Sequence, residues 1–93
     1  MRTEMITLID MLTIAEIPFE LTIDACGNEN GQLWYPSYEE RTCDVICHEY
    51  SYGGPQGLLE IMGLVDDDCD DDVMGWLTAE NVFARIYTDF MNR

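Results

Sequence analysis

The stretch GLLEIMGLVDDDCDDDVMGWLTAENVFARIYTDF, residues 57–90, decides the fold. It holds two short apolar runs, residues 58–62 and 73–77, on either side of an acidic segment, residues 66–72. Like charges this close together cannot be removed from water, so we expect the acidic segment to be a surface loop between two short strands. Thr78 then stands where its side chain can cap the start of a helix.

This C-terminal helix has an apolar stripe at helical spacing, which is typical of a helix packed on one side. Its members are Val82, Phe83, Ile86, Tyr87 and Phe90. Glu80 in the first turn and Arg93 at the end have the charges that favour a helix dipole. We therefore expect one face of this helix to be buried.

A second helix is expected near the N-terminus, over about residues 4–16, because apolar residues recur there at helical spacing. They are Met5, Leu8, Ile9, Leu12 and Ala15. Thr3 is placed to cap its start, and Pro18 to end it. The alternation of apolar and polar residues over 19–24 then predicts a half-buried strand.

The middle of the chain predicts further strands. Residues 27–31, GNENG, tolerate positive φ and precede the apolar run 33–35, which is typical of a β-hairpin. Residues 42–50 are rich in β-formers and apolar on both faces, which suits a central strand. We therefore predict an α+β fold, a small antiparallel sheet of three to five strands with an N-terminal and a C-terminal helix packed on one face, as a single domain over 1–93.

Charge is the most informative property of the composition. Nineteen Asp and Glu stand against four Arg and Lys together, with a formal net charge of -15. Nucleic acids and anionic membranes repel such a chain, so we expect no direct binding to either. No apolar run reaches the ~18 residues of a membrane span, and Glu4 and Asp10 occupy a region that is basic and then apolar in a signal peptide. We expect a cytoplasmic protein of a bacterial host.

Signs of catalysis are absent from the sequence. His48 is the one histidine, and no G-x-S-x-G, H-E-x-x-H or phosphate-binding loop pattern occurs. Nineteen carboxylates produce accidental pairs, so pairing identifies no catalytic residue. We predict that the protein is no enzyme and has no cofactor.

Two metal sites remain open as alternatives. A zinc site would use Cys43, Cys47 and His48, with Cys26 or Cys69 as the fourth ligand. The C-x3-C spacing is unusual for such a site, and buried thiols are the expected alternative. The alternating aspartates in 66–72 match a calcium loop at first, but Asp71 and Leu77 stand where an EF-hand needs Gly and Glu. We expect a solvated loop that binds divalent cations weakly, with a structural calcium or magnesium ion as the alternative.

The acidity predicts a basic protein partner. Carboxylates on a folded scaffold can occupy a surface that otherwise binds phosphates, so we predict a non-enzymatic DNA mimic that blocks the nucleic-acid-binding surface of another protein. Exposed aromatic residues would add specific contacts, although we expect Trp34 to lie in the core. The candidate partner-binding residues are Asp66, Asp67, Asp68, Asp70, Asp71, Asp72, Glu39, Glu40, Asp44, Glu49 and Tyr52.

Four segments add a resemblance. CDVI at 43–46, SYGG at 51–54, GLLEIMG at 57–63 and LTAE at 77–80 resemble segments of small uncharacterised proteins from phages and integrated elements of Gram-positive bacteria. Such elements also encode small acidic inhibitors of CRISPR nucleases and other host defences. The resemblance therefore implies an anti-CRISPR or other anti-defence role, with a host defence nuclease as partner, and supplies no functional residues.

The acidity is also compatible with two roles that need no basic partner. The chain is alternatively a structural or regulatory interaction module of a phage or mobile element, a homodimer or assembly subunit whose charge maintains solubility. Adaptation to a high-salt cytoplasm would also give many carboxylates and no lysine.

Overall fold

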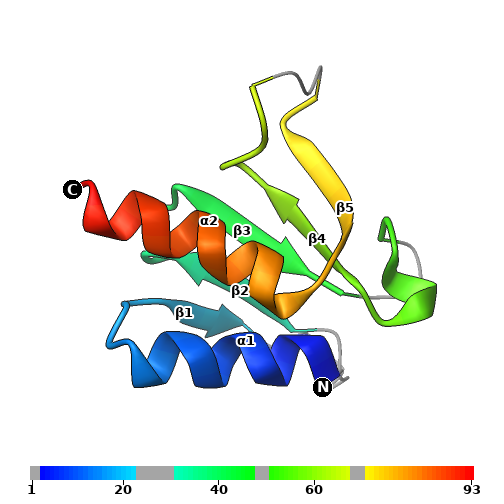
Figure 1. Cartoon of the computed structure of the whole chain (residues 1–93), viewed down its shortest axis with the longest axis horizontal. Helices are drawn as coiled ribbons and strands as arrows, with labels where there is room; N and C mark the ends of the chain where they lie inside the picture. The colour runs from blue at the N-terminus through cyan, green and yellow to red at the C-terminus, as the bar shows by residue number, and fades with distance from the viewer. Residues whose placement is uncertain (1–2, 23–30, 48–50, 68–70) are drawn as a thin grey trace.

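A computed structural model of the chain describes residues 3–22, 31–47, 51–67 and 71–93. In chain order the elements are α1 (Thr3–Ile14), β1 (Glu20–Thr22), β2 (Gln32–Tyr35), β3 (Cys43–Ile46), the short 3-10 helix η1 (Gly54–Gln56), β4 (Leu59–Met62), β5 (Val73–Leu77) and α2 (Ala79–Met91). The strands form one antiparallel sheet in the order β1-β2-β3-β4-β5 (Figure 1). The predicted α+β fold is confirmed. Within the described segments, no helix is long and apolar enough to cross a membrane.

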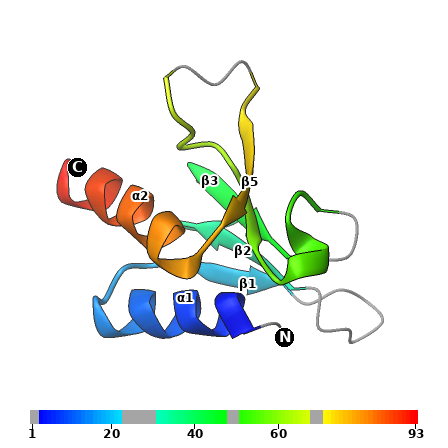
Figure 2. The ribbon, with the colours of Figure 1, turned by 45° about the vertical axis from the view of Figure 1, so that its right-hand side comes forward.

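The core lies between the sheet and the two helices. Leu33, Val45 and Ile61 stand in register across β2, β3 and β4, and all three are fully buried. Both helices cover this face and pack against each other (Figures 1 and 2). The alternate residues of the strands point to the other side of the sheet, because successive side chains of a strand face opposite ways. We call this side the open face; its residues are Gln32, Trp34, Asp44, Ile46, Glu60 and Met62.

Helix α1 ends at Ile14, two residues before the predicted end. Glu16 has a positive φ of 58° and donates its N–H to the Thr13 carbonyl at 3.1 Å. Ile17 donates its N–H to the Leu12 carbonyl at 3.0 Å. These two bonds form a Schellman motif, which satisfies the last carbonyls of the helix. The helix is therefore ended by this motif, before Pro18 can act. Thr3, expected as the cap, lies inside the helix.

Helix α2 begins as predicted. Thr78 and Asn81 form a capping box, with each side chain accepting from the backbone N–H of the other at 3.2 Å. The Ala79 N–H donates to Glu4 Oε1 at 2.7 Å, so α1 helps to cap α2. This contact depends on tertiary structure and was not predicted.

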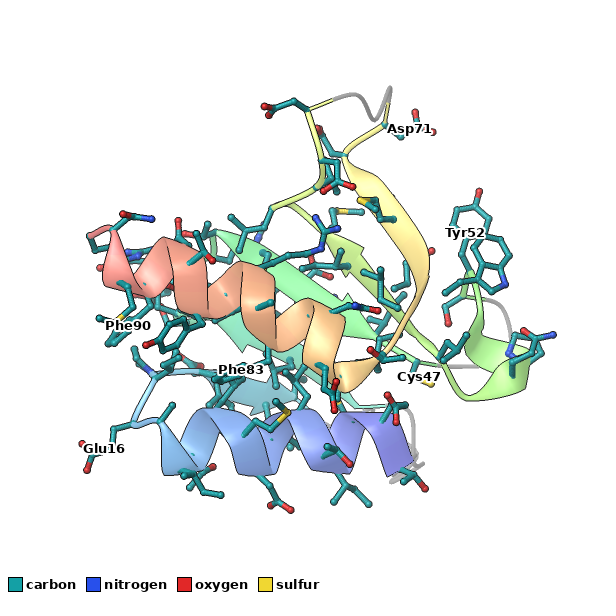
Figure 3. The ribbon with its side chains drawn as sticks, viewed as in Figure 1. Glu16, Cys47, Tyr52, Asp71, Phe83 and Phe90 are labelled. Carbon is teal, nitrogen blue, oxygen red and sulfur yellow. The ribbon has the colours of Figure 1, made fainter. Side chains whose placement is uncertain are left out.

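The predicted stripe of α2 is mostly confirmed. Val82 and Ile86 are fully buried, and Phe83 and Phe90 pack against the core from the side (Figure 3). Tyr87 is 45% exposed, so its prediction as a core residue was wrong. It lies at the border of the stripe, where solvent reaches it.

Two strand predictions need correction. All three residues of β1, an edge strand of the sheet, are exposed, and the buried alternation expected for it is missing. Ile23 and the predicted turn at 27–30 lie outside the described residues, although β1 and β2 do pair as a hairpin requires. Trp34 is not in the core: it lies half-buried on the open face, since Leu33 and Tyr35 take the core positions of β2.

The central strand is confirmed in place but is shorter than predicted. β3 occupies the middle of the sheet and ends at Ile46, and residues 48–50 of the predicted strand lie outside the described residues. Strands β4 and β5 are both present at the predicted positions.

Candidate functional site

Two connections meet at the same end of the sheet. Residues 36–42 join β2 to β3, and residues 63–72 join β4 to β5. They lie at one end because Asp44, near the start of β3, pairs with Met62, the last residue of β4. The β4–β5 hairpin projects beyond the body of the molecule in both views (Figures 1 and 2). Its base is closed by the Gly63 N–H, which donates to the Asp72 carbonyl at 2.8 Å.

The acidic candidates that the structure describes gather at this end of the sheet. The acidic side chains of the two connections are exposed, and Asp44 is half-buried. Asp44 and Asp72 line the same cleft of about 200 Å³ together with Arg41, which follows Glu39 and Glu40 in the chain. Asp68, Asp70 and Glu49 lie outside the described residues. We call the described set the acidic end: Glu39, Glu40, Asp44, Asp66, Asp67, Asp71 and Asp72.

Each described arginine contacts other groups of the same chain. Arg85 donates from Nη1 to the Leu64 carbonyl at 3.0 Å and to Asp66 Oδ1 at 2.8 Å, which ties the β4–β5 hairpin to α2. Arg41 and Arg93 lie over aromatic rings. Within the described part of the chain, six side chains of the acidic end have no ion-pair partner: Glu39, Glu40, Asp44, Asp67, Asp71 and Asp72. Their charges are therefore open to a partner.

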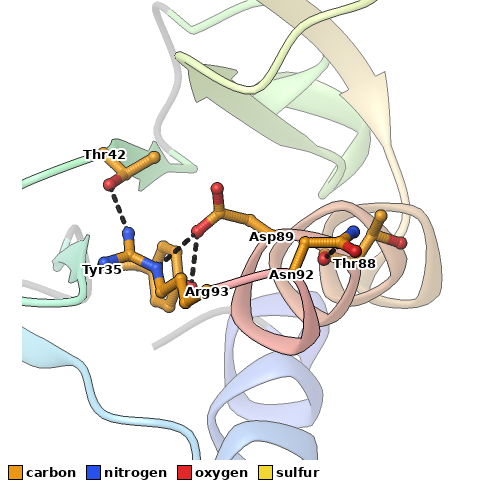
Figure 4. Close-up of polar contacts among 6 residues, drawn as sticks. All are labelled: Tyr35, Thr42, Thr88, Asp89, Asn92 and Arg93. Carbon is orange, nitrogen blue, oxygen red and sulfur yellow. Dashed lines mark hydrogen bonds and ion pairs between the residues drawn. The ribbon is translucent and has the colours of Figure 1, made fainter.

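A polar cluster fixes the base of the acidic end (Figure 4). The buried Tyr35 hydroxyl donates to Asp89 Oδ2 at 2.7 Å, and Arg93 Nε donates to the same oxygen at 2.8 Å. Arg93 also donates from Nη2 to Thr42 Oγ1 at 2.7 Å. The cluster thus holds the end of α2 against the β2–β3 connection.

The pKa values in this cluster favour a structural role. Burial raises the pKa of Tyr35 to about 12, and the hydrogen bond to Asp89 adds to this effect. For Asp89, burial acts to raise the pKa, but hydrogen bonds from Tyr35 and Arg93 outweigh burial, and the net pKa is lowered. At neutral pH the phenol is therefore protonated and the carboxylate ionised, so neither is poised to exchange a proton.

A larger cleft of about 620 Å³ lies between α2 and the β4–β5 connection. Arg85, Asp66 and Asp89 line it together with Leu64 and Thr88. Its charged groups are already paired with each other or with the sheet. The cleft separates hairpin from helix, and Arg85 bridges the two.

The two described cysteines are buried thiols. Cys43 and Cys47 are each 2% exposed. Burial raises the pKa of Cys43 to about 12, with help from the carboxylates of Asp44 and Asp89, so this thiol stays protonated. The two cysteines are four residues apart along an extended strand, or about 13 Å, whereas zinc needs its sulfur ligands within about 2.3 Å of the metal. They cannot share a zinc ion.

The other metal candidates were predicted at His48, Cys26 and Cys69 and in the acidic loop. His48, Cys26 and Cys69 lie outside the described residues. Among the residues that are described, no three His, Cys, Asp or Glu side chains could hold a metal ion. Asp66 of the proposed calcium loop is paired with Arg85.

Tyr52 lies away from the acidic end. It follows β3 in the chain, whereas Asp71 lies in the β4–β5 hairpin, just before β5 begins (Figure 3). Its ring stacks on Trp76 with centroids 5.6 Å apart. Trp76 was not among the predicted site residues. The preceding residue, Gly75, is the feature of the sequence that could have drawn attention to Trp76. A glycine inside an apolar strand indicates a bulge or a close approach of another backbone.

Comparison of the chain with models of protein families, with curated proteins and with solved structures finds no match. Its function has to be inferred from its own geometry and charge.

Proposed function

We propose that this protein is a non-enzymatic inhibitor whose acidic end occupies the basic, nucleic-acid-binding surface of a partner protein. One observation carries the proposal. Two connections, distant in sequence, place exposed carboxylates at one end of the sheet, while each described arginine contacts other groups of the same chain. Negative charge is concentrated at that end and is only partly offset, by the Arg85–Asp66 ion pair and by Arg41 beside Asp44 and Asp72.

The physical basis is the competition between carboxylates and phosphates for the same cations. A surface that binds nucleic acid gains affinity from Lys and Arg contacts to phosphates. The projecting β4–β5 hairpin can enter such a surface, because it extends beyond the sheet (Figure 1). A net charge of -15 also speeds the encounter, by an amount that falls steeply as salt is added.

The proposed partner is a basic nucleic-acid-binding protein. A basic groove is the surface that attracts this end of the molecule. We further propose a host defence nuclease as the partner, in the cytoplasm of a bacterial host, which is the partner class that the sequence resemblance implies.

The test uses two variants of equal charge. The hairpin variant carries Asp67→Asn, Asp71→Asn and Asp72→Asn. The control variant carries Asp10→Asn, Glu16→Gln and Glu80→Gln, which removes three exposed carboxylates from other parts of the surface. Each protein is immobilised, loaded with bacterial lysate at low salt, and eluted with duplex DNA or with a salt gradient.

We expect a nucleic-acid enzyme that is retained by the wild type and the control variant, displaced by DNA, and lost from the hairpin variant. Equal loss from both variants would show that net charge alone retains the enzyme, against a role for the acidic end. Retention that DNA does not displace would contradict mimicry.

A second function, self-association as a homodimer or assembly subunit, is favoured by two exposed apolar side chains. Ile6 and Ile14 of α1 are 46% and 83% exposed. Sedimentation at rising concentration tests it: a mass that increases in the wild type and not in an Ile14→Ser variant would support this function.

A further inference from the structure

Two large aromatic side chains are exposed at the edge strand β5: Trp76 within the strand and Tyr52 next to it. Tyr52 and Trp76 are 57% and 61% exposed, and their rings stack with an interplanar angle of 16°. Figure 3 shows Tyr52 pointing away from the body of the molecule. Exposed aromatic pairs of this size are common anchors of protein interfaces.

The backbone holds this pair in place. Trp76 has a positive φ of 56°, and its N–H donates to the Tyr52 carbonyl at 3.1 Å. A Cβ on Gly53 would collide with the Trp76 backbone, and one on Gly75 would collide with Tyr52. A left-handed non-glycine residue is strained and persists only where its surroundings impose it. The stacked pair is therefore a built and ordered feature.

The same sheet already holds a guanidinium on an aromatic pair. Trp34 and Tyr38 meet edge to face with centroids 4.9 Å apart, and Arg41 lies 5.2 Å from the centre of each ring. At Tyr52 and Trp76 none of the described arginines takes the corresponding place, since Arg85 and Arg93 are bound to Asp66 and Asp89.

A carboxylate adjoins the exposed pair. Glu60 lies on the open face of β4, and its Oε1 accepts the Tyr52 N–H at 3.2 Å. An aromatic face with a carboxylate next to it attracts a cation by both cation–π and Coulomb interactions.

We propose that Tyr52, Trp76 and Glu60 form a subsite for an arginine side chain of the protein partner. The subsite rests on the proposed function, because it supplies the specific contact that the acidic end lacks. Arginine fits better than lysine, since its planar guanidinium stacks flat on a ring while its N–H groups reach a carboxylate.

The experiment titrates the whole ¹⁵N-labelled protein with two peptides of equal charge, acetyl-hexaarginine amide and acetyl-hexalysine amide. The chain has two tryptophans, so their two indole N–H signals report on Trp34 and Trp76 separately. The variants are Trp76→Ala and Tyr52→Leu, the second of which keeps apolar bulk without an aromatic face. Tyr87→Ala, which removes an exposed tyrosine from α2, is the control.

We expect hexaarginine to shift the Trp76 indole signal and to bind more tightly than hexalysine. Either site variant should lower hexaarginine affinity about two- to five-fold, as exposed cation–π contacts do, and the control should not. Equal, salt-sensitive binding of both peptides with no effect of the site variants would overturn the subsite and leave the proposed function standing. If neither peptide bound in a salt-sensitive way, both proposals would fail.

Discussion

Replacing Tyr35 with Phe tests how the fold supports the acidic end. The substitution removes the hydroxyl that donates to Asp89 at 2.7 Å and leaves the buried ring in place. A hydrogen bond to a charged group contributes about 1.5–3 kcal/mol. The rise in the pKa of Tyr35 from 10.0 to about 12 has burial of the phenol as its first cause and this hydrogen bond as its second, so the bond accounts for only part of the rise. We therefore expect Tyr35→Phe to lower the free energy of unfolding by about 2 kcal/mol at pH 7.

The cost of this substitution should depend on pH with a definite sign. The folded pKa of Tyr35 lies above its unfolded value, so the protonated phenol stabilises the fold fully below pH 10. This contribution is lost as the pH rises from 10 to about 12. Cys43 also loses stabilisation in this range, because its pKa is raised from 9.0 to about 12, but it does so equally in both proteins. The difference between wild type and Tyr35→Phe should therefore shrink above pH 10.

Urea unfolding followed by circular dichroism at pH 7 and at pH 11.5 measures both effects. Urea is used because an ionic denaturant would screen the acidic surface. Tyr38→Phe, which removes a phenol that is 52% exposed, is the control and should change stability by less than about 0.5 kcal/mol at either pH. A Tyr35→Phe cost that is the same at both pH values, or absent at pH 7, would refute the role assigned to this hydrogen bond.

Three further substitutions test other parts of the structure. Glu16→Gly should raise stability by about 0.5–1 kcal/mol in urea unfolding, because glycine suits the left-handed end of α1; a similar gain for Glu16→Ala would contradict this reason. Gly75→Ala should cost about 1–3 kcal/mol in the same assay and displace the Trp76 indole signal, since its methyl group would collide with Tyr52; an unchanged spectrum would argue against the close contact. Arg85→Gln makes the protein more negative but frees the β4–β5 hairpin from α2. We therefore expect the immobilised variant to retain less of the DNA-displaceable partner from lysate. Tighter retention would mean that net charge alone decides binding.

Local signals predicted most of the fold. Threonine is a favourable helix cap in most contexts, so the start of α2 at Thr78 was predicted correctly. The apolar runs at 58–62 and 73–77 are bounded by glycines and aspartates, which commonly end strands, so β4 and β5 were predicted as well. Trp34 was placed wrongly because composition says that a tryptophan is buried on average, whereas the alternation of β2 assigns the core to its neighbours. The end of α1 was misplaced because a glutamate in left-handed conformation has no sequence signal.

The sequence indicated which residues form the candidate site but not how they are arranged in space. The sequence shows that 36–42 and 63–72 are polar or acidic connections, but their meeting depends on β3 and β4 being neighbours, which is a property of the sheet order. The grouping of Tyr52 with the acidic residues is not reproduced, because the connection after β3 leads to the opposite end of the sheet. The role of Trp76 depends on a bulge in the β4–β5 pairing and on the approach of Tyr52.

The distribution of charge separates the binding hypothesis from one in which acidity only maintains solubility. A net charge of about 2–8 is enough to keep a small domain soluble, and this chain carries -15. Excess charge of one sign destabilises a compact state through self-repulsion, so it persists where something else favours it. If the negative charge served only to keep the protein soluble, basic side chains placed among the carboxylates would lower the repulsion between them without reducing solubility. Arg93 and Arg85 are instead bound to Asp89 and Asp66, where they brace α2 against the sheet and the hairpin. Arg41 does lie among the carboxylates, but it is over the rings of Trp34 and Tyr38, and the outer carboxylates have no ion-pair partner among the described residues. A surface arranged in this way is stabilised most by cations that another molecule brings.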